Sequence, residues 1–123
     1  MLRTFLRAKI HRATVTAADR DYEGSISIDR ALCRAAGLLE FEQVDVYDIT
    51  NGARFTTYAI YGEPGQIQIN GAAAALTRPG DLIIVAAYAA FAPDEVARHS
   101  TTIVQVDEKN RVTSTRTAAV RTP

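Results

Sequence analysis

The chain has 123 residues, 47% of them apolar, which fits one globular domain with a genuine hydrophobic core. Basic and acidic residues number 14 each, so no net charge attracts nucleic acid or an anionic membrane. The apolar run 82–92 is too short to cross a bilayer, and we expect no signal peptide. The single cysteine, Cys33, excludes an internal disulfide and predicts a reducing, cytoplasmic location.

The first predicted element is a long strand over 2–17, with a bend or bulge near Ile10. Lys9 and His11 lie two residues apart, so their side chains share one face of that strand. A lysine on a strand is commonly a solvated charge, and a histidine there is commonly a hydrogen-bonded structural residue. The strand pattern alone therefore leaves their role open.

A polar loop over 19–24 leads into a short strand over 25–28 and presents the carbonyl of Gly24 to the hydroxyl of Ser25. A serine Oγ held against the preceding carbonyl can attack it where the turn is strained and donors stabilise the oxyanion. The common alternative for Gly-Ser is a solvated turn before a strand.

The clearest helix begins after Asp29, a good N-cap, and ends at Gly37. A strand over 43–49, the turn Asn51-Gly52 and a return strand over 54–61 then predict a hairpin. On the return strand Arg54 and Tyr58 share one face and Thr57 takes the other. Strand twist near the end of a hairpin still allows all three to reach one cleft.

A strand over 66–69 precedes Asn70, Gly71 and the small residues Ala72, Ala73 and Ala74. Such residues let a ligand approach backbone N–H groups, and a short alanine-rich core helix is the competing interpretation. Strands follow over 82–88, 101–106 and 112–115, with a brief helix from Pro93 and a flexible tail over 117–123. Six or seven short strands predict a mainly β, closed or nearly closed barrel domain over 1–116.

The chain resembles the pyruvoyl-dependent aspartate 1-decarboxylase family over roughly residues 1–107. The resemblance is carried by Leu2-Arg3-Thr4, Lys9-Ile10-His11-Arg12, Tyr22-Glu23-Gly24-Ser25, Thr50-Asn51-Gly52, Thr57-Tyr58-Ala59-Ile60 and Asn70-Gly71-Ala72-Ala73-Ala74. It implies a double-psi β-barrel, a homotetramer with active sites between subunits, and a proenzyme cut at Gly24–Ser25, with or without a maturation factor. Tyr47 stands where some members have tryptophan, and Ala75 where histidine is frequent.

The resemblance also implies the chemistry. Ser25 becomes a covalent pyruvoyl group, which forms a Schiff base with L-aspartate and yields β-alanine and carbon dioxide for pantothenate synthesis. It implies that Thr57 assists self-cleavage and that Tyr58 is the catalytic proton donor. It assigns substrate binding to Lys9, His11, Arg54, Thr57, Asn70, Gly71, Ala72, Ala73 and Ala74. No metal is implied.

Two other functions stay open at this point. Ser25 and His11 could belong to a serine hydrolase, although no carboxylate stands in an orienting position and no G-x-S-x-G motif occurs. The chain could also be a non-catalytic barrel whose Lys9 and Arg54 hold a small acidic ligand or a protein partner.

Overall fold

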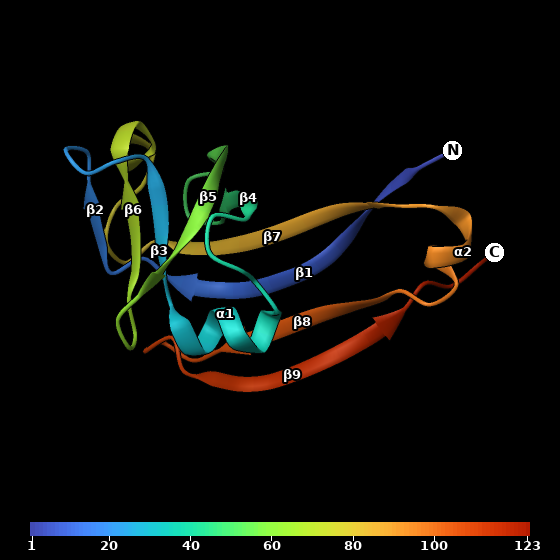
Figure 1. Ribbon diagram of the computed structural model, residues 1–123. Coiled ribbons are helices and arrows are strands. Elements are labelled where there is room, and N and C mark those ends of the chain that lie inside the picture. The colour runs from blue at the N-terminus through green and yellow to red at the C-terminus, as the bar shows by residue number, and fades with distance from the viewer.

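The structure is a computed structural model that describes residues 1–123. Its strands run in the order β2-β6-β3-β5-β4-β7-β1-β8-β9 (Figure 1). The strands are β1 (Arg3–Thr14), β2 (Ala17–Asp19), β3 (Ser25–Asp29), β4 (Gln43–Asp48), β5 (Arg54–Gly62), β6 (Ile67–Asn70), β7 (Leu82–Phe91), β8 (Ser100–Val106) and β9 (Val112–Ala119). The helices are α1 (Arg30–Ala36), α2 (Pro93–Val96) and the 3-10 helix η1 (Gly71–Leu76). This mainly β, single-domain architecture agrees with the predicted double-psi β-barrel.

The core lies between the inner faces of the strands. Alternate strand residues share a face, and in β4 every second residue, namely Val44, Val46 and Asp48, is buried. A cluster of 19 buried residues fills this space, among them Ile10, Ile26, Val44, Val85 and Val104. Each such side chain stabilises the fold by about 1.5–3 kcal/mol. The intervening residues of the same strands face outward, where the candidate site residues lie.

The first strand differs from its prediction in length. β1 ends at Thr14, residues 15–16 belong to no strand, and a separate short strand, β2, begins at Ala17 and pairs with β6. The bend or bulge predicted near Ile10 is confirmed by a register shift between His11 and Ala13, and a second shift lies between Leu6 and Ala8. The chain therefore has nine strands rather than six or seven.

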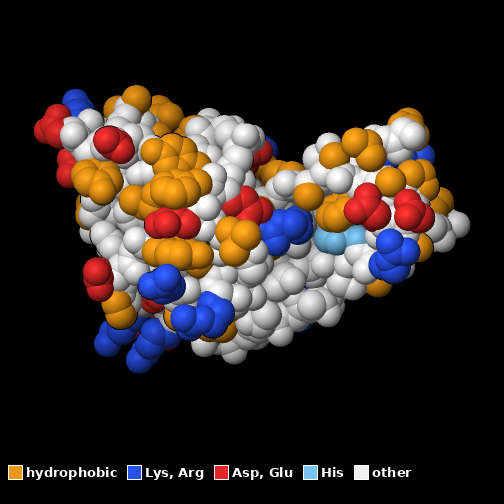
Figure 2. Space-filling model, in the orientation of Figure 1, with side chains coloured by type: hydrophobic (Ala, Val, Ile, Leu, Met, Phe, Trp, Pro, Cys, Tyr) orange, Lys and Arg blue, Asp and Glu red, His pale blue; other side chains and the backbone are white.

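The long strands β1, β7, β8 and β9 extend from the barrel toward α2 and both chain ends (Figure 1). In the space-filling view they form an arm that is narrower than the body (Figure 2). The sequence predicted that the last strand stops at Thr115, which is wrong, because β9 reaches Ala119 and pairs Thr117–Ala119 with Ser100–Thr102. Flexibility of the remaining tail stays a prediction.

The predicted helix boundaries are confirmed at both ends of α1. Asp29 Oδ1 accepts the backbone N–H of Ala31 at 2.8 Å, and Gly37 adopts the left-handed conformation with φ +72°. The second carboxylate oxygen of Asp29 accepts the N–H of Gly65 at 2.7 Å, which ties the helix to the β5–β6 turn. None of the helices has the length and apolar character needed to span a membrane.

A buried carboxyl supports the turn that precedes Arg54. Asp48 is 2% exposed, and its Oδ1 accepts the backbone N–H groups of Thr50 and Asn51 at 2.9 and 3.2 Å. Its Oδ2 is buried without a hydrogen-bond donor. Burial, and next the neighbouring carboxyl of Asp81, raise the pKa of Asp48 to about 6.

This carboxyl makes the stability of the fold depend on pH. Folding raises the pKa of Asp48 from 3.8 to about 6, so the folded state holds the proton more tightly than the unfolded state does. The resulting contribution to the free energy of unfolding is present in full below pH 4 and is lost as pH rises through 6. Asp48→Asn removes the ionisation and keeps the Oδ1 contacts. We expect urea unfolding to show this variant gaining stability over the native chain by up to about 3 kcal/mol at pH 8, and far less at pH 4. An equal difference at both pH values, or the same trend in the exposed control Asp94→Asn, contradicts this assignment.

Candidate active site

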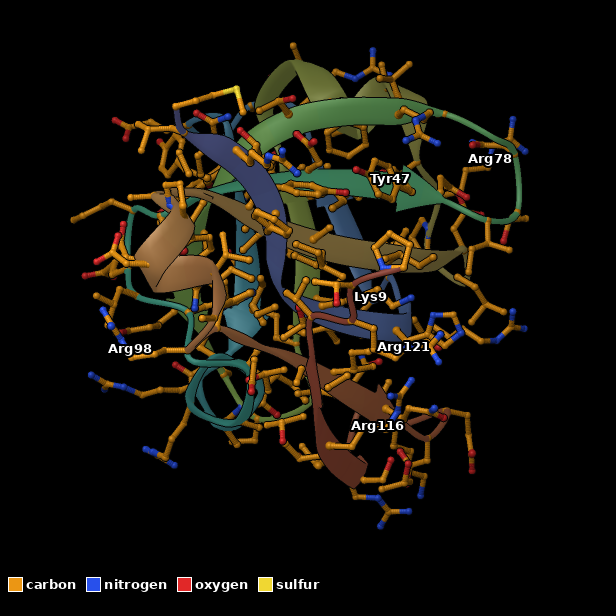
Figure 3. All side chains as sticks on the ribbon, turned by 90° about the vertical axis from the view of Figure 1, so that its right-hand side faces the viewer. Lys9, Tyr47, Arg78, Arg98, Arg116 and Arg121 are labelled. Atoms are coloured by element: carbon orange, nitrogen blue, oxygen red, sulfur yellow. The ribbon has the colours of Figure 1, made fainter.

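Three predicted site residues lie together on the outer face of four strands. Antiparallel register aligns one row across β1, β7, β4 and β5, and it consists of His11, Ile84, Tyr47 and Arg54. Lys9 begins the next row, two residues along β1. Directly opposed residues of antiparallel strands present their side chains to the same side. We call Lys9, His11 and Arg54 the cation group; Lys9 and the neighbouring Tyr47 are labelled in Figure 3.

Arg54 is held by an aromatic ring rather than by a carboxylate. Its guanidinium carbon lies 4.0 Å from the centroid of the Tyr47 ring, and Arg54 forms no salt bridge. The Tyr47 hydroxyl hydrogen-bonds with that of Tyr88 at 2.8 Å. Burial, and next this hydrogen bond, raise the pKa of Tyr47 to about 12, so the ring stays neutral. The guanidinium N–H groups of Arg54 are therefore free to bind an anion.

The aromatic support of Arg54 was not predicted. Sequence analysis noted Tyr47 only as a departure from the family pattern and did not consider Tyr88. The alternation of β4 places Tyr47 on the outer face and could have suggested it. The contact with Tyr88 depends on the pairing of β4 with β7, for which the sequence carries no local signal.

His11 belongs to the cation group by position, but its own ring is uncharged. Burial, and next the charges of Lys9 and Arg12, lower its pKa, so the imidazole is neutral at pH 7. Its Nδ1 is buried and has no hydrogen-bond partner. The ring lines a surface hollow of about 400 Å³ beside Gln105 and Asp107.

Ser25 is the centre of a second group. The serine is 1% exposed; its hydroxyl donates to the Glu23 carbonyl at 2.9 Å and accepts the side-chain Nδ2–H of Asn70 at 3.0 Å. The same Nδ2 donates to Ser27 Oγ at 3.1 Å. This arrangement follows from the pairing of β3 with β6, which sets Ser25 opposite Asn70. The predicted proximity of Asn70 to Ser25 is thus present within one chain.

Gly71, the first of the small residues after Asn70, packs against Gly24. Gly71 has φ +76°, and a Cβ built on it falls 2.6 Å from the Gly24 Cα. It opens η1, in which Ala72 is exposed, Ala73 half-buried and Ala74 buried. Glycine at this position therefore serves both a left-handed conformation and a close backbone contact.

Tyr58 and Thr57 lie on β5, the strand that pairs with the strand of Ser25. Ile26 pairs with Ala59 in the parallel β3–β5 ladder, so the preceding residues, Ser25 and Tyr58, occupy adjacent outward positions. Thr57 has the opposite parity, across from Val44, as the alternation predicted. Even so, Thr57 and Tyr58 both line a hollow of about 520 Å³, so parity does not separate them. We call Gly24, Ser25, Thr57, Tyr58, Asn70 and Gly71 the serine group.

No hydrogen bond joins the two groups within one chain, since the side-chain partners of Ser25 and Asn70 include neither Lys9 nor His11 nor Arg54. In the sheet order β5, β4 and β7 lie between β3 and β1. Arg54 stands four residues before Tyr58 on β5, about 13 Å away along the strand. Neither hydrogen-bond partner of the Ser25 hydroxyl is a histidine, so the serine–histidine pair of a hydrolase is not formed.

The contact between Gly71 and Gly24 can be tested by adding one methyl group. We expect Gly71→Ala to destabilise the fold by about 1–2 kcal/mol for the positive φ and by a further amount for the collision with Gly24. The matched control is Gly52→Ala, because Gly52 has φ +81° but no atom within 4 Å of its Cβ position. Urea unfolding of both variants measures the difference. Equal losses would show that Gly24 moves away without cost.

Comparison with known proteins identifies the class. The sequence model described as aspartate decarboxylase matches residues 1–113. Three curated relatives are each named aspartate 1-decarboxylase. The relative from Hydrogenobaculum sp. is 54% identical over 112 residues, which cover 91% of this chain and 90% of the relative. The relative from Caulobacter vibrioides is 55% identical over 114 residues, with 91% and 97% covered. The relative from Myxococcus xanthus is 52% identical over 125 residues, with 100% and 96% covered.

These matches cover nearly the whole length of this mainly β domain. They show that the protein is a decarboxylase, an enzyme of the lyase class. The chain belongs to the aspartate decarboxylase family. The resemblance seen in the sequence is therefore confirmed at the level of the family.

Proposed function

We propose that this chain decarboxylates L-aspartate to β-alanine and carbon dioxide with a pyruvoyl group made from its own Ser25, a step that supplies pantothenate synthesis. The observation that supports it most is the setting of Ser25. The serine follows Gly24 directly, is buried, and holds its hydroxyl between an amide donor and a carbonyl acceptor. A buried hydroxyl in that position is placed for reaction with its own backbone.

Self-processing begins at the Ser25 hydroxyl. Oγ attacks the Gly24 carbonyl carbon, the Gly24–Ser25 C–N bond breaks, and the hydroxyl proton goes to the freed amine, giving an ester. Loss of the Cα proton with departure of the Gly24 carboxylate leaves a dehydroalanine, which water converts to pyruvoyl with release of ammonia. In this proposal Asn70 Nδ2, which donates to Ser25 Oγ, stabilises the charge on Oγ, and Thr57 assists at the ester. Gly71 leaves the space in which Gly24 can move.

The residues present fit a pyruvoyl group and an acidic substrate. When formed, the ketone accepts the substrate amine and withdraws electrons from the bond to the leaving carboxylate. Asn70 Nδ2, 3.0 Å from Ser25 Oγ, offers a hydrogen-bond donor to a carbonyl oxygen at this place. Arg54 binds a substrate carboxylate through its free guanidinium N–H groups, and Lys9 and neutral His11 line the same pocket. Tyr58 returns a proton to the α-carbon, and the backbone of Ala72–Ala74 completes the cradle.

We further propose that the active site forms between subunits of a homotetramer. No hydrogen bond joins the serine group to the cation group within one chain, and a neighbouring copy can supply the cations that the serine group lacks. The buried thiol of Cys33, whose pKa burial raises to about 11, fits a protein of the reducing cytoplasm. Whether a maturation factor speeds the cut is decided by comparing purified precursor with precursor in cell extract.

Intact-mass measurement tests the self-processing. We expect the native chain to separate into two fragments at Gly24–Ser25, the larger with the mass deficit of a pyruvoyl end. Ser25→Ala should stay a single chain without decarboxylase activity, since no Oγ remains to attack. Ser27→Ala is the matched control, because its hydroxyl bonds to the same Asn70 amide but adjoins no glycine carbonyl, and it should still be cut. A cut, active Ser25→Ala variant would refute the mechanism.

Mixed oligomers test the shared active site. Ser25→Ala lacks the serine group's nucleophile, and Arg54→Ala lacks the carboxylate anchor, so each alone should turn over little aspartate. Co-expressed chains that mix at random should regain roughly a quarter of native activity, because some sites combine both intact halves. The control is the two variants purified separately and assayed together without subunit exchange. If co-expression gives no more activity than that control, Ser25 and Arg54 belong to the same chain's site.

A further inference from the structure

A row of side-chain amides begins at Gln66, just before β6, continues along that strand and ends at Ser25. Gln68 Nε2 donates to Asn70 Oδ1 at 2.8 Å, and Gln66 Nε2 donates to Gln68 Oε1 at 3.2 Å. The backbone N–H of Glu63 donates to Gln66 Oε1 at 2.8 Å. Because strand residues two apart share a face, the three amides of Gln66, Gln68 and Asn70 lie in one line. We call these three side chains the amide row.

At both ends of the amide row, the neighbouring backbone group fixes which atom donates the hydrogen bond and which accepts it. A side-chain amide can rotate by 180° and exchange its donor for its acceptor, but a backbone N–H is always a donor. At one end Glu63 N–H requires the oxygen of Gln66 to face it. At the other end the Glu23 carbonyl can only accept the Ser25 hydroxyl, which leaves Oγ to accept from Asn70. Each amide between them therefore has one orientation that satisfies every bond.

The space beside Gly62 holds the start of the amide row in place. A Cβ on Gly62 would lie 2.7 Å from Gln66 Oε1, so only glycine allows that oxygen to approach the β5–β6 turn. Asn70 at the far end is 1% exposed and cannot exchange its bonds for water. If the Asn70 amide were inverted, its NH₂ group would face the NH₂ group of Gln68. Restoring a donor–acceptor pair there would require Gln68 and Gln66 to invert as well, and the NH₂ group of Gln66 would then face the N–H of Glu63.

We propose that Gln68 is a positioning residue for self-processing: by donating to Asn70 Oδ1, it keeps Asn70 Nδ2 turned toward Ser25 Oγ. This inference rests on the proposed cut at Gly24–Ser25. As Oγ loses its proton and attacks, negative charge grows on it, and a donor at 3.0 Å stabilises that charge. An inverted Asn70 presents Oδ1 instead, which repels the charge. Gln68 touches neither Gly24 nor the substrate and acts only through Asn70.

Gln68→Glu tests whether donation from residue 68 to Asn70 Oδ1 sets the orientation of Asn70, because glutamate has nearly the same shape as glutamine. At pH 8 the introduced carboxylate cannot donate, so Asn70 turns its NH₂ group to it and its oxygen to Ser25. We expect the precursor, followed by intact mass, to be cut at least about tenfold more slowly than the native precursor at that pH. At pH 4–5 the carboxyl gains a proton and donates again, so the ratio of the two rates should return toward one.

Two further variants separate positioning from packing. Gln68→Met neither donates nor accepts, so it leaves Asn70 free to take either orientation and should slow the cut only about twofold. Thr113→Glu adds the same charge on the exposed strand β9, where the side chain has no such role, and should be cut at the native rate. Recovery of the glutamate variant at low pH within one preparation also shows that the chain is folded.

The outcomes distinguish this inference from the proposed function. If the native chain is not cut, alone or in extract, the proposed function fails and the inference fails with it. If the native chain is cut and Gln68→Glu is cut at the same rate at pH 8, only the inference is overturned. Equal, pH-independent slowing of the Glu and Met variants also overturns it, because that result indicates packing.

Discussion

The pairing of β3 with β6 places Ser25 opposite Asn70, and the arrangement of the serine group depends on this one register. A shift by one residue would turn Ser25 into the core and Ile26 to the outside, because strand side chains alternate. Ile26, Ile28, Ile67 and Ile69 are each 0% exposed, so burial of these four side chains opposes any such shift. The hydrophobic core thereby determines which polar atoms meet on the opposite face.

The cation group obeys a different constraint, set by charge. In a chain without net charge, recognition of an acidic molecule must come from individual side chains. Arg54 is suited to this because it stacks on an uncharged ring and has no carboxylate partner. A salt bridge would occupy the same N–H groups. The hydroxyl contact between Tyr47 and Tyr88 keeps that ring fixed across two strands, so Arg54 is oriented without being neutralised.

Sequence reasoning succeeded where a feature depends on nearby residues. Asp29, Gly37 and the Asn51-Gly52 turn act within a few residues of their own position, and the structure has each as predicted. It missed the second half of β9, a strand whose residues are nearly all exposed and show no apolar period. Hydrogen bonds to β8 hold that strand instead, and such a ladder leaves no hydrophobic pattern in the sequence.

The candidate site shows the same division between local and distant signals. Gly24-Ser25 and the residues 70–74 could each be noted from composition, but their contact joins positions 45 residues apart and was supplied by the family resemblance. The amide row was not noticed, although Gln66, Gln68 and Asn70 alternate in the sequence. Alternation predicts a shared face, whereas the direction of each amide depends on Glu63 N–H and the Glu23 carbonyl, which only the folded chain brings into contact.

The separation of the two groups has a physical reason of its own. The serine group contains hydroxyls, amides and backbone but no ionised side chain, so it can be buried at low cost once its hydrogen bonds are made. Lysine and arginine in the same place would have to leave water before any anion was there to pair with them, which costs several kcal/mol for each ion. On the outer face of β1 and β5 they stay hydrated. In the proposed tetramer they meet the serine of a neighbouring chain, and the acidic substrate supplies the opposite charge as the pocket fills.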